Sequence, residues 1–366
     1  MLFRSERAVA VDTGSVDGSA KLLSGARIKC IPSERGEGFG TAISEAVATL
    51  PPCESDDEWL WLLHDDSAPD QNALKNLLEA VEDRPNVAMV GPKILGWHNR
   101  THLLEVGISI ARNGARWTGL EDDEYDQGQH DGIFEALSVS TAGALIRRSV
   151  FEELGGFDEK LDLFRDDVDF GWRIHTAGQT VLVNTDAVLY HAQAAATERR
   201  SVDVDEAFLN RPHLLDRRNA AYVLLTNSTW WMLPLISLQL LGAAILRAIG
   251  YLFAKLPGYA SDELLALFRL VIRPDQVRAG RKWRKADRLV SPRIVTRFMP
   301  SRITQFRSAL ENLLDRIQGS LFPVQSAIGN EISEDEDLLS PITNRDWKMI
   351  LKRPERSEEH TSELQS

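Results

Sequence analysis

Three carboxylates fall within four positions of the stretch 164–173, at Asp166, Asp167 and Asp169. Apolar residues follow at helical spacing, so a helix is predicted to begin at Asp166 or Asp167. Acidic residues in a first turn cap free N–H groups and complement the helix dipole, which accounts for one or two of them. Because clustered carboxylates repel one another unless a metal ion or a proton compensates them, the full set predicts a charged functional site.

A second acidic pair follows an apolar run. Residues 59–63 predict a strand buried on both faces, and the run ends in His64, Asp65 and Asp66. In open α/β sheets ligands bind beyond the carboxyl ends of strands, so Asp65 and Asp66 are predicted to be functional. A helix cap is the alternative, and Asp70, just before an apolar helical pattern, suits that role better.

Strand-like and helix-like segments alternate along residues 8–191. Strands are predicted at 8–11, 27–31, 59–63, 86–90, 103–110, 137–146, 180–183 and 187–190, with helices at 39–47, 73–81, 149–154 and from the acidic stretch onward. Asn113-Gly114 is typical of a hairpin turn. The pattern predicts an α/β fold, and the small residues at 140–144 would let a ligand approach the backbone.

Two other features of this region point to ligands more weakly. Glycine-rich loops at 12–19 and 35–40 follow the first two predicted strands, and the second opens a helix whose N-terminus could face a phosphate. A plain turn is the alternative for both loops. His191 ends the last predicted strand, where a metal ligand and a structural histidine are equally open.

Length and composition bound the class of protein. The 366 residues suggest one large domain with an appendage, and a net charge of -12 argues against a nucleic-acid binder. The two cysteines, Cys30 and Cys53, give no disulfide framework and no metal-ligand spacing, so a reducing compartment is expected. The N-terminus shows no signal peptide pattern.

The character of the chain changes at Trp230. Residues 230–246 are almost wholly apolar, Arg247 interrupts them, and the apolar pattern resumes at 248–254. Three alternatives stay open: a tilted membrane span, an interfacial helix with Trp230 and Trp231 at the headgroups, and a buried core helix.

A basic run follows the apolar segment. It suits the cytoplasmic side of an anionic membrane, and it lacks the aromatic interleaving, beyond Trp283, that nucleic-acid binding favours. The run consists of Arg269, Arg273, Arg278, Arg281, Lys282, Arg284, Lys285 and Arg288. Residues 319–355 are interpreted as a linker, and 356–366 as translated sequencing-adapter read-through, which is left out of the fold.

These motifs together resemble family 2 glycosyltransferases, which have the GT-A fold. Residues 10–19 resemble the family's "VDnxSxDGS" segment, and residues 63–66 resemble its DXD-type element. Residues 143–148, 154–158 and 164–173 are similar to its "GGFDE…fxEDvDLxxR" block, and Tyr190-His191 to its closing histidine element. The resemblance covers residues 8 to about 220, in order, and the layout is most similar to actinobacterial enzymes joined to a membrane region.

The resemblance implies inverting transfer of a sugar from a nucleotide-diphosphate donor to an acceptor hydroxyl. Asp66 would be the principal ligand of a Mg²⁺ or Mn²⁺ ion, with Asp65 beside it reaching metal or ribose and His191 completing the shell. Asp167 would be the general base and Asp166 the second choice. His64 stands where an aspartate often begins the DXD element.

Further residues and boundaries follow from the same resemblance. The expected substrate-binding residues are Asp12, Asp17, Gly38, Phe39, Asp65, Gly143 and Trp172. The expected regions are a GT-A Rossmann-like mixed sheet flanked by helices (1–220, lacking the family's first strand and helix), a helical membrane-associated region (221–318) and a tail (319–366). A glycan or lipid-linked acceptor and the cytoplasmic face of the plasma membrane are the expected partners and location.

Two alternatives remain at this stage. A catalytically inactive, transferase-like domain would bind the nucleotide-sugar without turnover, and His64 in the DXD element favours it. A sugar nucleotidyltransferase would need a glycine-rich loop with a basic residue near the N-terminus, and residues 14–19 contain no lysine or arginine.

Overall fold

The structure is a computed structural model that describes residues 8–15, 18–26, 28–33, 38–121, 123–161, 163–192 and 211–301. The predicted nucleotide contact Asp17 and the predicted tail 319–366 lie outside the described residues.

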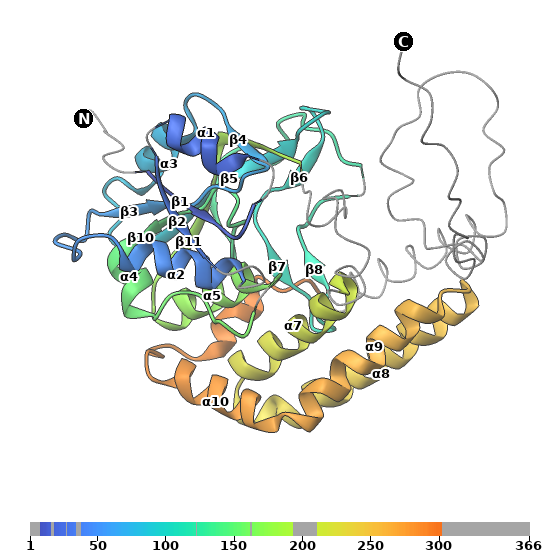
Figure 1. Ribbon diagram of the computed structural model, residues 1–366. Coiled ribbons are helices and arrows are strands. Elements are labelled where there is room, and N and C mark those ends of the chain that lie inside the picture. The colour runs from blue at the N-terminus through green and yellow to red at the C-terminus, as the bar shows by residue number, and fades with distance from the viewer. Residues whose placement is uncertain are drawn as a thin grey trace, which may run out of the picture.

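A mixed seven-stranded sheet forms the centre of the first half (Figure 1). Its hydrogen-bonded path runs β3 (Trp59–Trp61), β10 (Leu145–Arg147), β5 (Val87–Gly96), β11 (Thr180–His191) and β4 (Ser67–Pro69), with β6 (Leu103–Glu105) on β5 and β9 (Ile133–Glu135) on β11. β5 and β11 are parallel neighbours, and the other pairings are antiparallel. Every residue of β5 is buried, as expected for a strand covered on both faces.

Two smaller pairs of strands accompany this sheet. β1 (Val9–Asp12) and β2 (Lys29–Pro32) are parallel and joined through α1 (Ser19–Gly25), while β7 (Ser109–Ile110) and β8 (Arg116–Trp117) form a hairpin. The hairpin turn contains Asn113-Gly114, as predicted, and Gly114 has φ 87°. The predicted single strand 103–110 is divided because Gly107 adopts φ 81°, and a Cβ atom there would lie 3.0 Å from Val183 Cγ2.

Helices cover both faces of the large sheet. α2 (Phe39–Ala48), α4 (Arg148–Glu153) and α5 (Asp166–Thr176) share one core cluster with the strands, and α3 (Ala73–Val81) packs against the opposite face. α5 begins at Asp166, as predicted, directly after Phe164 and Arg165, which have φ values of 64° and 69°. These two left-handed residues turn the chain sharply into the helix, so all three carboxylates lie in its first turn.

Two strand predictions are wrong in detail. Only residues 145 and 146 of the predicted strand 137–146 belong to β10, because the chain turns at 141–143. β3 is shorter than predicted and ends the hydrogen-bonded path, so Trp59 and Trp61 are half-buried rather than buried on both faces. The Arg147 guanidinium stacks on the Trp59 ring at 4.6 Å and shields part of that surface.

The second half of the described chain is helical. Figure 1 shows α8 (Leu233–Phe253) and α9 (Pro257–Ile272) as a long pair at the outer edge of the molecule, with α7 (Pro212–Asn227) between this pair and the sheet. The short helix η1 (Trp230–Met232) leads into α8, and α10 (Pro274–Lys285) and η2 (Pro292–Arg297) follow α9. The predicted domain boundary at residue 220 falls within α7, which also packs against α5.

α8 is mostly exposed. Among the described helices it is the one long and apolar enough to cross a membrane, and 22% of its most apolar window is buried. This low burial argues against the core-helix alternative. Arg247, the charge that interrupts the apolar run, pairs with Glu263 of α9 at 2.9 Å, so its guanidinium is directed at a helix of the same chain.

The basic run does not lie on one free surface. The Arg284 side chain is fully buried and pairs with Asp158 and Asp169, each at 2.7 Å. Arg281 donates to the carbonyl oxygens of Leu225 and Ser228, and Arg288 donates to that of Asn227. The interpretation of the whole run as a membrane-facing charge cluster is therefore wrong for these three arginines, because their guanidinium groups bind partners within the fold.

Candidate active site

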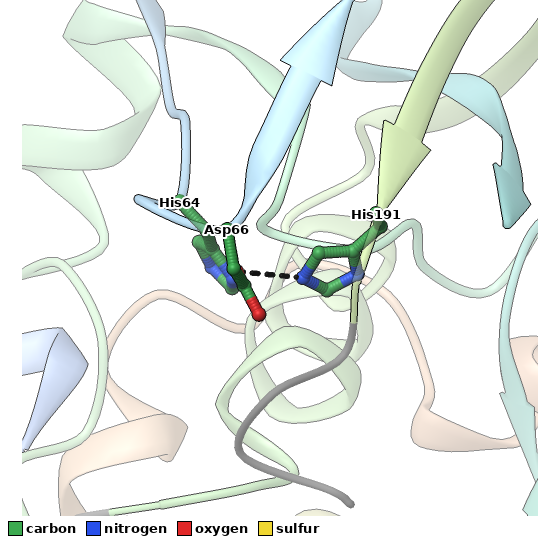
Figure 2. A group of neighbouring side chains, drawn as sticks. All are labelled: His64, Asp66 and His191. Atoms are coloured by element: carbon green, nitrogen blue, oxygen red, sulfur yellow. Dashed lines mark hydrogen bonds and ion pairs between the residues drawn. The ribbon is translucent and has the colours of Figure 1, made fainter. Parts of the chain in front are cut away.

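Three side chains from two strand ends converge at one place (Figure 2). His64 and Asp66 lie in the turn between β3 and β4, and His191 ends β11. The antiparallel pairing of β4 with β11 sets Ser67 opposite His191, which brings the turn to the strand end. One ligand atom of each of the three residues lies within 4.8 Å of the others, so the group could hold a metal ion.

Hydrogen bonds orient this group. His191 Nε2 lies 3.1 Å from Asp66 Oδ1, and His64 Nε2 lies 3.1 Å from Thr141 Oγ1. Burial, and then the neighbouring His191, lower the pKa of His64 to about 4. His64 is therefore neutral at pH 7 and keeps a nitrogen lone pair, which is the form of imidazole that binds metals.

The candidate metal group contains His64, which was not predicted as a ligand, and does not contain Asp65, which was. His64, the departure from the DXD pattern, belongs to the candidate metal group, whereas Asp65 does not. Asp65 is exposed between His64 and Asp66, and its role as a metal ligand stays a prediction. A substrate contact remains the prediction for Asp65.

The acidic start of α5 lies near the group formed by His64, Asp66 and His191. Arg116 Nη1 donates to Asp167 Oδ2 at 2.9 Å, and Arg116 Nη2 donates to Glu105 Oε1 at 2.9 Å. The charge of Asp167, with those of Asp66 and Asp65, partly opposes the lowering of the His64 pKa by burial. The two acidic clusters are thus close enough to act on one imidazole, although Asp66 and Asp167 are about a hundred residues apart in the chain.

The three carboxylates of α5 have different environments. Burial, and then the charge of Asp167, raise the pKa of Asp166 to about 7. Burial alone would also raise the pKa of Asp169, but Arg284 and then Arg173 outweigh it and lower this pKa. Asp169 is consequently a structural anion, and Asp166 and Asp167 are the pair available for chemistry.

Phe39 is next to the metal group, and Gly38 immediately precedes it. The Phe39 ring meets the His64 ring edge-on at a centroid distance of 4.8 Å, and Gly38 is the residue before α2. Asp12 lies in the separate β1–β2 pair, where its carboxylate accepts from the Ser15 N–H at 2.8 Å. The roles of these residues toward a nucleotide remain predictions.

Gly143 and Trp172 have structural explanations at their positions. A Cβ atom at Gly143 would lie 2.8 Å from Pro92 Cγ and 2.9 Å from Leu189 Cδ1, so close packing, rather than access for a ligand, requires a glycine. Trp172 is 2% exposed and belongs to the core cluster that joins α5 to α7. Neither residue is part of the candidate metal group, and the contact of each with a substrate stays a prediction.

Arg116 and Glu105 were not among the predicted site residues, and Thr141 was noted only as one of the small residues at 140–144. Arg116 lies 51 positions from its partner Asp167 and Thr141 lies 77 positions from His64. A polar residue in a short hairpin has no pattern of its own, and its partner depends on how the hairpin docks. The alternation in 103–117 with the Asn113-Gly114 turn was the available signal, and it predicts the hairpin but not the ion pair.

Comparison with known proteins identifies a family whose model matches this chain. The model of the family described as "Glycosyltransferase like family 2" matches residues 9–207. An N-acetylglucosaminyl-diphospho-decaprenol L-rhamnosyltransferase of Mycobacterium tuberculosis is 26% identical over 262 residues, which is 63% of this chain and 80% of that protein. The O-antigen biosynthesis protein RfbC of Myxococcus xanthus is 30% identical over 153 residues, 40% of this chain and 12% of its own length.

Solved structures are similar at low identity. GalNAc-T7 with UDP, GalNAc and Mn²⁺ has a TM-score of 0.43 and 13% identity, covering 60% of this chain and 41% of its own. The mannosyltransferase PcManGT from Pyrobaculum calidifontis, in complex with GDP-Man and Mn²⁺, has a TM-score of 0.38 and 15% identity, covering 87% of this chain and 79% of its own.

Proposed function

The chain belongs to glycosyltransferase-like family 2, and we propose that it transfers a sugar, with inversion, from a nucleotide-diphosphate donor to a hydroxyl of a lipid-linked acceptor in cell-envelope glycan synthesis. The observation that best supports this proposal is the convergence of His64, Asp66 and His191 near Asp167. Metal ligands for a diphosphate and a carboxylate for the acceptor are the two requirements of a single displacement.

The donor set fits a divalent transition metal. Two imidazoles and one carboxylate suit Mn²⁺ better than Mg²⁺, which prefers oxygen ligands and retains its waters. A bound cation of this kind supplies positive charge to the departing diphosphate. Asp66, oriented by its contact with His191, would be the one protein carboxylate in the group, leaving positions for phosphate oxygens.

Asp167 is our proposed general base. Its carboxylate forms an ion pair with Arg116, and a positioned carboxylate can accept the proton of the acceptor hydroxyl. Asp166, with a pKa of about 7, carries a proton in a large fraction of molecules at neutral pH and is the second candidate. Arg116 would also fix the direction of the Asp167 carboxylate, because it is itself held by Glu105.

Support for a lipid-linked acceptor comes from two sides. The name of the mycobacterial relative includes a diphospho-decaprenol acceptor. In this chain, α8 and α9 expose apolar side chains on their outer surface: Leu235, Leu238, Leu241, Ile245, Leu246, Ile249, Leu252, Phe253, Leu264, Phe268, Val271 and Ile272. Because α8 packs on α9 along one side and exposes the other, we propose that the pair lies in the membrane interface at the cytoplasmic face.

The neighbouring tryptophans support the same arrangement. Trp230, at the start of the pair, is 76% exposed, and tryptophan favours the headgroup region of a bilayer. The Arg247–Glu263 ion pair lies between the two helices, so the charge that would be costly in a lipid-facing span is neutralised within the protein.

The test combines metal binding with transfer. The purified chain is titrated with Mn²⁺ by calorimetry and then assayed with a panel of nucleotide-diphosphate sugars and a lipid-diphosphate-linked N-acetylglucosamine acceptor. Asp66→Asn should weaken Mn²⁺ binding at least about tenfold, since even an outer-shell partner contributes that much, and should abolish transfer. Asp70→Asn, an exposed carboxylate a few residues away, is the matched control. Unchanged transfer in Asp66→Asn would refute the proposal, and nucleotide binding without turnover in the wild type would favour an inactive domain.

A further inference from the structure

A cavity separate from the metal group lies where the sheet domain meets the helical region. Its volume is about 250 Å³, and it is lined by α5, the end of α7, the start of α8 and η2. Trp172, Leu224, Met232 and Ile236 supply apolar surface. None of His64, Asp66 and His191 lines it.

Two guanidinium groups complement this apolar lining. Arg112, from the turn of the β7–β8 hairpin, and Arg293, from η2, both border the cavity. Within the described residues neither of them pairs with a carboxylate, and Arg293 lies over the Trp231 ring at 4.3 Å. An apolar pocket with two cations at its edge is complementary to an amphiphile with a phosphate-type head and a hydrocarbon chain.

Trp172 adds an independent sign of a ligand. The residue is 2% exposed, and its indole N–H is buried without an acceptor among the described residues. A buried donor without a partner is costly, and such donors are ordinarily satisfied. A polar ligand atom in the cavity would give this N–H an acceptor.

The cavity adjoins both the membrane-facing helices and the proposed base. Met232 of η1 and Ile236 of α8 line it, while Leu235 and Leu238 of α8 are exposed, so the cavity borders the surface that we propose faces the membrane. On the other side, Arg112 and Arg116 belong to one hairpin, and their Cα atoms are at most about 14 Å apart, the reach of four extended residues. Arg116 contacts Asp167, so one hairpin contributes a residue to the cavity and a residue that binds the proposed base.

We propose that this cavity binds the start of the lipid chain of a polyprenyl-diphosphate-linked acceptor, with Arg112 and Arg293 holding its diphosphate. The inference rests on the proposed function, since it names the acceptor class of the same transfer. The volume is below the roughly 300 to 1,000 Å³ of sites that enclose a whole ligand, so the remainder of the chain stays in the bilayer.

The experiment measures binding without catalysis, so it is decided independently of whether transfer occurs. Farnesyl diphosphate is titrated into the purified chain by calorimetry, with farnesol and inorganic diphosphate as separate probes. Farnesyl diphosphate should bind at least about tenfold more tightly than either part, because each part satisfies only one side of the cavity. Arg112→Gln with Arg293→Gln should remove that advantage, and Arg269→Gln, an exposed arginine of α9, should not.

Two further arms make the result unambiguous. Gln239→Trp fills the cavity from α8 and should weaken farnesyl diphosphate binding while leaving inorganic diphosphate unaffected. Equal farnesyl diphosphate affinity in the wild type and the double arginine variant would overturn the proposal. So would equally tight binding of short-chain phosphatidic acid, because the cavity would then be a site for bulk phospholipid.

Discussion

Replacing Asp166 by asparagine tests the electrostatics at the start of α5. Raising the Asp166 pKa from 3.8 to about 7 means that the folded chain binds a proton more readily than the unfolded chain between these pH values. The free energy of unfolding therefore falls as the pH rises from about 4 to 7, by as much as about 4 kcal/mol at about 1.36 kcal/mol per pKa unit. Asparagine is neutral throughout and lacks this penalty.

The variant should accordingly be more stable than the wild type at high pH. At pH 8 we expect the free energy of unfolding of Asp166→Asn to exceed that of the wild type by about 4 kcal/mol. At pH 5 this gap between the two free energies should be less than about 2 kcal/mol. Urea unfolding followed by circular dichroism at both pH values measures the gap. Asp57→Asn, an exposed position in the connector before β3, should show no gap that depends on pH.

The result that would refute this reasoning is a gap of equal size at pH 5 and pH 8. Such a result would mean that Asp166 is ionised in the folded chain across the whole range. The repulsion between Asp166 and Asp167 would then have to be relieved by Arg116, and our assignment of the protonated partner would be wrong.

Three further outcomes are expected. Asp167→Asn should lower turnover at least about 10²-fold, the contribution of a general base, whereas Asp166→Asn should keep most of it. Arg284→Gln should lower the free energy of unfolding by about 3 to 5 kcal/mol in urea, because it leaves two buried carboxylates without their shared cation. Leu238→Asp should reduce sedimentation with anionic vesicles at least about tenfold, because a leucine that enters the bilayer contributes about 1.5 to 3 kcal/mol.

Matched controls separate these effects from general damage. Lys285→Gln changes an exposed cation next to Arg284 and should leave unfolding unchanged, and Leu22→Asp changes a leucine of α1 that is 77% exposed and should leave vesicle binding unchanged. Turnover lost in Asp166→Asn but kept in Asp167→Asn would transfer the role of base to Asp166. Equal vesicle binding by Leu238→Asp and the wild type would contradict the proposed membrane surface.

Elements with a local signal were predictable from the sequence. The start of α5 at Asp166, the helix from Phe39 and the Asn113-Gly114 turn each depend on neighbouring residues in the chain, and the structure confirms them. The predicted strand ends also placed Asp66 and His191 close together, because Asp66 follows β3 and His191 ends β11 in the same sheet.

Features that depend on tertiary contacts were not predictable. His64 was interpreted as a departure from a motif, and its place in the metal group follows from the pairing of β4 with β11. The basic run was interpreted as one membrane-facing surface, but the partners of Arg284 lie 115 and 126 positions away in the chain. A charge pattern alone does not distinguish a buried cation from an exposed one.

The order of the helices along the chain decides how a water-soluble form of this enzyme can be made. Stopping the chain near residue 220, at the predicted end of the GT-A domain, would delete the guanidinium that Asp158 and Asp169 share. The apolar α8–α9 pair lies in sequence between α7 and α10, so a C-terminal truncation that removes the pair also removes Arg284. Solubility must therefore come from polar substitutions on the outer surface of α8 and α9, with α10 retained.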